Sequence, residues 1–430
     1  MRNGKPSPYR LTTLPNGLTV VLRPMEHVES VAVGIWVRAG GRYERLEQAG
    51  ISHFVEHLLF KGTHTRSCES LKQAIEGIGG SLNGFTAEEF TCYMAKVPAK
   101  YLERALNVLS DMVRRPSLRA RDIEKEREVI LEEIRMAEDT PGQYVHEVFN
   151  QLLWPNHPLG SLLAGTADTV RGLSRRDLVD YWKRLYHPRN LLVSCAGAFE
   201  AERVVRHVRR TFPRGPRPTL RRAVPAPRSP RGPCVKVLHK ATEQTHLCLG
   251  TPAIPRTHPQ RFALELLHVV LGGNMSSRLF REVREKRGLV YEIGTHVKRY
   301  QDTGAFVVYA GCDAAKLETV LETVLTELAR LKRERVTPRE LQRAKDFYGG
   351  QLLMSLEDTL EQMLWIGEQT VTVGRVSRPQ ELVRAMERVT PQQIQQAARR
   401  LFVSERMFLA VVGPVPEAQA SVLARACVVG

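Results

Sequence analysis

The chain repeats its own sequence pattern on either side of its midpoint. The segment from Ser174 to Gly197 aligns without gaps with the segment from Thr390 to Gly413. Residues 121–125 align in the same way with residues 339–343, and both offsets are about half of the 430 residues. Self-similarity at a fixed period is typical of duplicated structural units. The chain is therefore interpreted as an internal duplication.

The duplication strongly constrains the fold. A chain of 430 residues is too long for one ordinary hydrophobic core. We predict the α+β class, with two duplicated αβ halves that each have a mainly antiparallel sheet and helices packed on one face. Residues 213–233 are dense in proline and arginine and have no periodicity, so they are predicted to be a linker. The predicted domains are residues 1–212 and 234–430.

Hydrophobic periodicity and turn signals place the elements of the first half. The predicted helices are residues 48–61, 70–78, 100–114, 121–137 and 177–186. The predicted strands are residues 18–22, 31–37, 81–86, 90–97 and 191–196.

The first of these helices carries a candidate metal site. His53 and His57 are one helical turn apart, so their imidazoles can converge on one metal ion. Glu56 lies on the same side of the helix, opposite an apolar sector, and this order is the inverted zinc-peptidase motif His-x-x-Glu-His. Two histidines on one helix face are more often only solvated, and a metal needs a third ligand.

Glu126 and Glu133 are candidates for that third ligand. Their spacing corresponds to two helical turns, so both project from nearly the same helix face. On spacing alone, a solvated helix with ion pairs to Lys125 and Arg135 along its surface is the favoured explanation of both glutamates. In the second half, Ala344 stands at the position of Glu126 and Gln351 at that of Glu133, and the histidine motif is absent. Only the first half is therefore predicted to hold a metal.

Composition limits the classes of partner. The chain is 43% hydrophobic and 25% charged, which is typical of a soluble protein, and no apolar run is long enough for a membrane helix. The N-terminus has no apolar signal-peptide core and the seven cysteines form no Cys-x-x-Cys pair, so a reducing, cytoplasmic location is predicted. The net charge of +17 is spread along the chain without a nucleic-acid motif, so no nucleic-acid partner is predicted.

Together these motifs resemble the pitrilysin-type zinc peptidases, in the branch of mitochondrial processing peptidase and its bacterial relatives. The resemblance extends over nearly the whole chain, and Glu133 follows the histidine motif at the separation along the sequence that the family shows. Further matching segments are residues 60–63, 79–83, 276–280 and 288–291. The resemblance implies one zinc ion per chain, bound by His53, His57 and Glu133, with Glu56 as the general base.

The resemblance also implies roles for residues that spacing leaves open. Glu126 would steady the metal-binding arm, and the register of the motif favours Glu133 over its neighbour Glu132 as the ligand. Arg284 and Tyr291 would contact substrate opposite the zinc, and Tyr291 would share the charge of the developing oxyanion.

A sheet edge from Gly79 to Phe85 would hold the substrate backbone as an added strand. Its substrate-binding residues would be Gly80, Ser81, Leu82 and Asn83. The family usually has Asn-Ala where this chain has Asn83-Gly84.

The resulting hypothesis is a zinc endopeptidase. The two halves would close like a clam shell around oligopeptides or unfolded segments, and the chain would form a homodimer. The alternative is a catalytically silent scaffold or partner subunit of a peptidase-like complex. The intact set of His53, Glu56, His57 and Glu133 argues against that alternative.

Overall fold

The computed structural model describes residues 7–213, 223–227 and 234–429. The chain forms two compact units. The first unit comprises Met1–Ile134, Leu162–Val224 and Leu353–Arg378. The second comprises Arg135–Ser161, Pro225–Leu352 and Pro379–Gly430. Each unit therefore contains a segment from the other half of the sequence.

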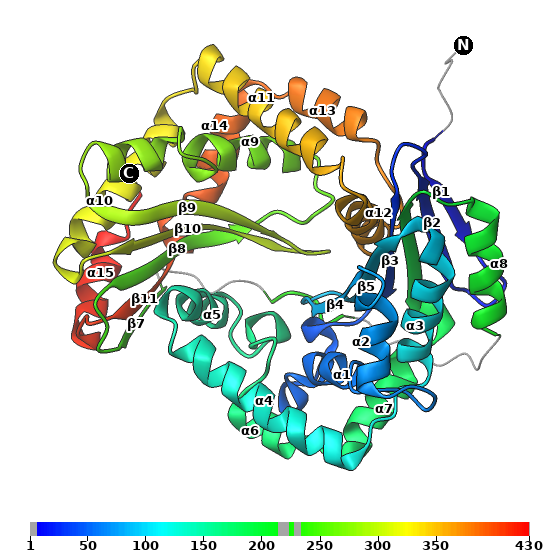
Figure 1. Cartoon of the computed structure of the whole chain (residues 1–430). Helices are drawn as coiled ribbons and strands as arrows, with labels where there is room; N and C mark the ends of the chain where they lie inside the picture. Colours follow the sequence, from blue (N-terminus) through cyan, green and yellow to red (C-terminus); the bar gives the residue numbers. More distant parts are fainter. Residues whose placement is uncertain (1–6, 214–222, 228–233, 430) are drawn as a thin grey trace, which may run out of the picture. The chain divides into compact units, whose positions relative to one another are not determined.

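The first unit is built on a six-stranded sheet in the order β1-β2-β6-β3-β5-β4 (Figure 1). Its strands are β1 Arg10–Thr13, β2 Thr19–Pro24, β3 Ser30–Val37, β4 Ser81–Thr86, β5 Thr91–Pro98 and β6 Leu191–Gly197. Only the β2–β6 pair is parallel, and the other four pairs are antiparallel. Its helices are α1 Ile51–Leu59, α2 Cys68–Glu76, α3 Leu102–Arg114, most of α4 Ala120–Glu138, α6 Ala167–Gly172, α7 Arg175–Leu185, α8 Ala201–Thr211 and α12 Thr359–Val373.

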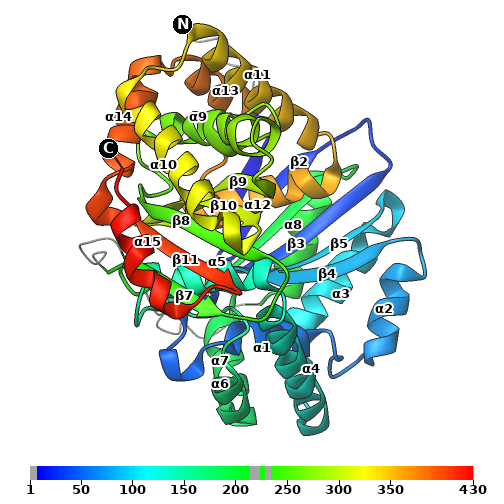
Figure 2. The ribbon, with the colours of Figure 1, turned by 90° about the vertical axis from the view of Figure 1, so that its left-hand side faces the viewer.

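Helices cover both faces of this sheet. Val33 and Ile35 of β3 point into the main core with α1 and α3, and α2 lies beside α3 and β4 (Figure 2). Trp36, on the opposite side of β3, packs in a smaller core with Met363 and Ile366 of α12. Because β3 is buried on both faces, its sequence is an almost unbroken apolar run rather than an alternating one.

The second unit repeats this plan with a five-stranded sheet in the order β7-β11-β8-β10-β9. Its strands are β7 Cys234–His239, β8 Thr245–Ala253, β9 Val290–Arg299, β10 Gly304–Cys312 and β11 Phe408–Gly413. Here only β7 and β11 are parallel. Its helices are α5 Pro141–Leu153, α9 Arg261–Gly272, the π-helix η6 Phe280–Glu285, α10 Leu317–Arg333, most of α11 Pro338–Ser355, α13 Pro379–Glu387, α14 Pro391–Leu401 and α15 Ala420–Ala426. Helix α5 packs on the sheet face opposite the main core.

The duplicated sequence positions adopt the same local structure. Ser174 caps α7 and Thr390 caps α14, each in a capping box with the residue three positions later. Helices α5 and α12 begin at Pro141 and Thr359, which occupy equivalent positions of the two halves, and each covers the second face of one sheet. The two halves therefore have similar folds. Each half of the sequence contributes one helix to the unit formed mainly by the other half, α5 to the second unit and α12 to the first.

These findings confirm the predicted class of two similar, mainly antiparallel αβ halves. The prediction that helices cover one face of each sheet needs correction, because α12 and α5 cover the second faces. The contiguous domains 1–212 and 234–430 likewise differ from the two compact units, which exchange those helices. The predicted linker, residues 213–233, lies outside the described residues except for residues 213 and 223–227.

Candidate metal centre

Helix α1 carries the histidine motif against the core of the first unit. Phe54, Val55 and Leu58 are buried in that core, as the apolar sector of the sequence predicts. His53 and His57 are half-buried, and their ring centroids are 4.5 Å apart. The one-turn spacing therefore brings the two imidazoles together.

Helix α4 supplies a carboxylate to the same place. The Glu133 Oε2 atom lies 3.8 Å from His53 Nε2 and 3.6 Å from His57 Nε2. Each of these three residues has a ligand atom within 4.8 Å of the others, and no other such group occurs among the residues that the structure describes. Glu132, the neighbouring candidate, is not part of it.

The donor set fits zinc. Zinc binds imidazole nitrogen and carboxylate oxygen at about 2.0–2.2 Å, so tetrahedral ligands lie about 3.4 Å apart. The distances from Glu133 to the two imidazoles are close to that value. Burial, and secondarily the charge of His57, lowers the pKa of His53 to about 4, so its ring is neutral as a ligand requires.

Glu126 fixes the orientation of His57. Its Oε2 atom lies 3.1 Å from His57 Nδ1, and its Oε1 atom lies 2.6 Å from Lys61 Nζ. Because a carboxylate only accepts, Nδ1 carries a proton, which leaves Nε2, on the side of Glu133, as the ring nitrogen that can bind a metal. Burial raises the pKa of Glu126, but hydrogen bonds from His57 and Lys61 outweigh it and hold this pKa below its usual value.

Glu56 is the other acidic residue of this site. Its side chain is buried, and its Oε2 atom accepts a 2.7 Å hydrogen bond from the Thr86 hydroxyl at the end of β4. Burial raises the pKa of Glu56, although the Thr86 hydrogen bond opposes the shift. A carboxylate with a raised pKa is better suited to accept and return a proton near neutral pH.

Glu44 anchors the start of α1, and sequence reasoning did not identify it. This buried carboxylate accepts hydrogen bonds from the backbone N–H groups of Gly50 at 2.8 Å and Ser52 at 2.7 Å. Burial raises the pKa of Glu44 to about 7 in spite of these bonds. Since His53 follows Ser52 directly, Glu44 fixes the helical turn that presents the first imidazole. A glutamate so far before a helix start is not a recognised capping signal.

Strand β4 is an outer edge of its sheet, as predicted. It pairs only with β5 among the described strands. Ser81 and Asn83 are exposed, Leu82 is half-buried, and Gly80 immediately precedes the strand. At Gly84 an added Cβ would lie 3.0 Å from the Phe60 ring, so glycine accommodates that ring here.

Arg284 and Tyr291 lie together in the second unit. The Arg284 guanidinium is 5.6 Å from the Tyr291 ring centroid and 4.8 Å from that of Phe280. The Tyr291 side chain is 76% exposed. A planar guanidinium over an exposed ring forms one surface for hydrogen bonding and stacking.

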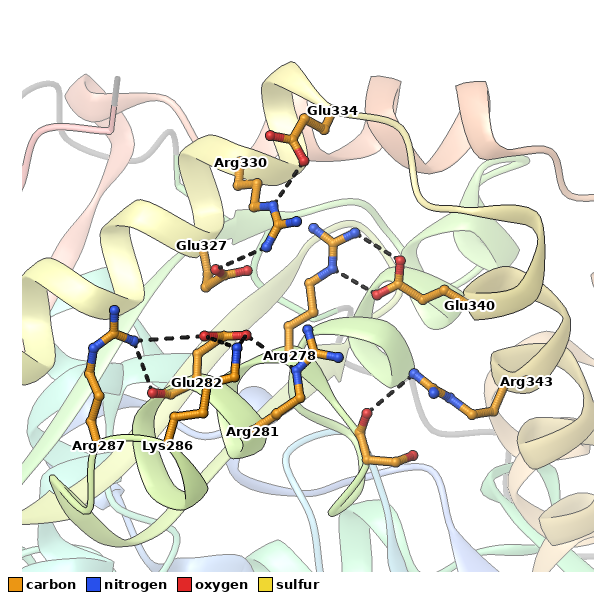
Figure 3. Close-up of polar contacts among 11 residues, drawn as sticks. Arg278, Arg281, Glu282, Lys286, Arg287, Glu327, Arg330, Glu334, Glu340 and Arg343 are labelled. Atoms are coloured by element: carbon orange, nitrogen blue, oxygen red, sulfur yellow. Dashed lines mark hydrogen bonds and ion pairs between the residues drawn. The ribbon is translucent and has the colours of Figure 1, made fainter.

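Arg284 lies on the π-helix η6. An ion-pair network surrounds this helix (Figure 3). Just before η6, the buried Arg278 donates to both carboxylate oxygens of Glu340 on α11, at 2.7 and 2.8 Å. Within η6, Glu282 accepts from Lys286 and Arg281. π-Helices are frequent at functional sites, and this one presents Arg284 from a supported backbone.

None of the described helices is both long and apolar enough to cross a membrane.

The fold and the site define a class of protein: a duplicated αβ protein whose first unit carries an inverted zinc-peptidase motif. Comparison with known families gives the same class. Residues 19–167 match the model described as Insulinase (Peptidase family M16), and residues 172–348 match Peptidase M16 inactive domain. The chain belongs to peptidase family M16, which confirms the pitrilysin-type resemblance.

The relatives extend over nearly the full chain. An uncharacterized zinc protease of Streptomyces coelicolor is 38% identical over 96% of this chain and 91% of its own length. An uncharacterized zinc protease of Bacillus subtilis is 35% identical over 94% of this chain and 97% of its own length.

Solved structures share the fold. A protease from Helicobacter pylori has a TM-score of 0.88 at 22% identity, over 94% of this chain and 99% of that chain. A peptidase M16 inactive domain from Pseudomonas fluorescens has a TM-score of 0.86 at 20% identity, over 95% of this chain and 98% of that chain.

Proposed function

We propose that this chain is a zinc-dependent endopeptidase. The observation that carries the proposal is the convergence of His53, His57 and Glu133 from two helices, with the buried Glu56 in the same motif. The relatives named zinc proteases support the same reaction class. His53 Nε2, His57 Nε2 and a Glu133 oxygen would hold one zinc ion per chain.

The proposed mechanism is general base catalysis at a metal-assisted hydrolase site. Zinc, when bound, supplies Lewis-acid activation of water and of the scissile carbonyl. Glu56 takes a proton from the attacking water at its carboxylate and returns it to the leaving amine. The Thr86 hydroxyl orients that carboxylate, and Glu126 keeps the His57 ring in one tautomer.

The substrate is proposed to be an oligopeptide or an unfolded segment bound as an added strand. The open edge of β4 offers backbone groups for this, and Thr86 at its end contacts Glu56. A peptide along this edge would therefore pass close to the proposed base. Arg284 and Tyr291 are proposed to contact the bound peptide, and Tyr291 to stabilise the developing oxyanion. An enclosing clam shell, which the family resemblance suggests, would make folded proteins resistant to cleavage.

A homodimer is proposed as the working assembly. Both the metal site and the Arg284–Tyr291 pair are present in one chain, so a different second subunit is not required to supply either. Light scattering at micromolar concentration should give twice the mass of one chain. A monomer that cleaves peptides at the full rate would exclude the dimer requirement.

The decisive test of activity is cleavage of a quenched fluorescent peptide by the zinc-loaded protein. Glu56→Gln should retain one zinc per chain and lose about 10²- to 10⁴-fold in kcat, the contribution of a positioned proton-transfer group. Glu47→Gln is the matched control, because Glu47 is an exposed glutamate shortly before the same helix. A chelator should abolish cleavage by the wild type. Normal turnover by Glu56→Gln would refute the assignment of the base, and an inactive but zinc-loaded wild type would favour the scaffold alternative.

A further inference from the structure

The second unit has a cavity that the proposed peptidase chemistry does not use. It encloses about 440 Å³, within the range of small-molecule sites. It lies among the end of β8 with the loop that follows it, helices α9 and α14, and the short turn before β11. Leu264, Ala397 and Leu401 line its wall, and His258, Arg400 and Arg406 are among its polar lining residues.

The wall of this cavity is aliphatic. Leu264, Ala397 and Leu401 are buried side chains on facing helices. The end of β8 adds a proline and an alanine, and the loop after it adds an isoleucine and a second proline. No phenylalanine, tyrosine, tryptophan or acidic residue lines it among the described residues. A flexible hydrocarbon chain fits such a wall, because the buried side chains that form it, Leu264, Ala397 and Leu401, are all aliphatic.

Each polar side chain that lines the cavity can donate a hydrogen bond; these side chains are His258, Gln260, Arg400 and Arg406. Arg400 is exposed and donates to the neutral Gln260 side chain, and Arg406 is exposed. Neither arginine has an ion pair within the part of the chain that the structure describes. His258 Nδ1 accepts the Gln260 backbone N–H at 3.1 Å, so its proton is on Nε2 and is available to an acceptor.

We propose that this cavity binds a medium-chain aliphatic carboxylate, such as a free fatty acid. The hydrocarbon chain occupies the aliphatic wall, and the carboxylate lies at the mouth between Arg400 and Arg406. A carboxylate supplies a negative charge beside these two positively charged side chains and accepts hydrogen bonds from their N–H groups. The site is separate from the zinc chemistry, so binding does not depend on catalysis.

The test is isothermal titration of the intact chain with octanoate, decanoate and dodecanoate, each below its micelle concentration. We expect one saturable site per chain. Each added methylene that is buried should tighten binding by about fourfold, the equivalent of about 0.8 kcal/mol, until the cavity is filled. Dodecanol should bind at least about tenfold more weakly than dodecanoate, because it cannot form the charged hydrogen bonds.

Two double variants distinguish binding at this cavity from nonspecific attraction of an anion to a basic protein. R400Q/R406Q should weaken dodecanoate binding by about tenfold or more. R384Q/R388Q removes two other exposed arginines of the same unit and should leave binding unchanged. A397L places a larger side chain in the cavity and should abolish binding. If A397L fails to fold, the comparison of R400Q/R406Q with R384Q/R388Q still tests the proposal.

The proposal is overturned by the absence of saturable binding, or by equal losses in the two double variants. It is also overturned if a folded A397L binds normally, or if a short peptide with an apolar C-terminal residue binds more tightly than dodecanoate. The last result would assign the cavity to peptide carboxylates instead.

Discussion

Glu126 gives the sharpest quantitative test of how the metal-binding arm is built. The residue is buried, and its two oxygens contact His57 Nδ1 at 3.1 Å and Lys61 Nζ at 2.6 Å. Glu126→Gln preserves the shape of the side chain but removes the charge and one of the two acceptor oxygens. Either His57 or Lys61 then faces an amide NH₂ group instead of an oxygen.

The expected cost follows from those two contacts. A charge-assisted hydrogen bond contributes about 1.5–3 kcal/mol, and loss of the carboxylate that orients a metal-binding histidine typically weakens metal affinity about 10- to 100-fold. These two figures agree, since a tenfold change in affinity is about 1.4 kcal/mol. We therefore expect the zinc dissociation constant of Glu126→Gln to rise by about 10- to 100-fold.

The assay is competition for zinc against a chromophoric chelator at fixed pH. Glu128→Gln is the matched control, because Glu128 is an exposed glutamate close to Glu126 on the same helix. The thermal stability of the two metal-free variants is compared in parallel, so that a general loss of folding is distinguished from a loss of metal affinity. If both variants bind zinc as tightly as the wild type, Glu126 does not orient the His57 ring.

Two further predictions concern the fold. An added Cβ at Gly367 of α12 would lie 2.3 Å from the Trp36 ring, so Gly367→Ala should destabilise the first unit by about 1–3 kcal/mol; Gly350→Ala in α11, which meets open space, should stabilise by about 0.5–1 kcal/mol. Urea unfolding measures the change in the free energy of unfolding for both variants. If Gly367→Ala is as stable as Gly350→Ala, α12 does not pack against Trp36 in the core. In the second unit, burial lowers the pKa values of His146 and His268 from 6.5 to about 4, so between these values the unfolded chain binds protons that the folded chain does not. Stability should therefore fall as the pH drops through this window, by up to about 1.4 kcal/mol per pH unit for each histidine. If an H146Q/H268Q variant loses stability with falling pH as steeply as the wild type does, these two histidines are not the cause of the loss.

Local patterns in the sequence predicted the part of the metal site that lies on α1. The i, i+4 spacing of His53 and His57 is sufficient to place two imidazoles on one side of a helix that also has a clear apolar face. Glu133 is different, because spacing alone left it an ordinary solvated glutamate. Its approach to the histidines depends on how α4 packs against α1, and only the family resemblance pointed to it.

The parts that sequence reasoning missed depend on long-range contacts. Glu44 caps α1 across an intervening turn, and Thr86 contacts Glu56 from a strand that follows α1 and α2. The position of α12 on the first sheet was missed for a related reason, since it packs on a strand from the opposite half of the sequence. The unbroken apolar run of β3 around Trp36 was the available signal, because a strand with two apolar faces must be covered on both.

The claim on which the account depends is that His53, His57 and Glu133 bind one metal ion. Its most direct test is zinc content by mass spectrometry after dialysis, for the wild type, Glu133→Gln and Glu132→Gln. The account predicts one zinc per chain in the wild type and in Glu132→Gln, and little or none in Glu133→Gln. Equal zinc content in the two variants, or a wild type that retains none, would contradict it.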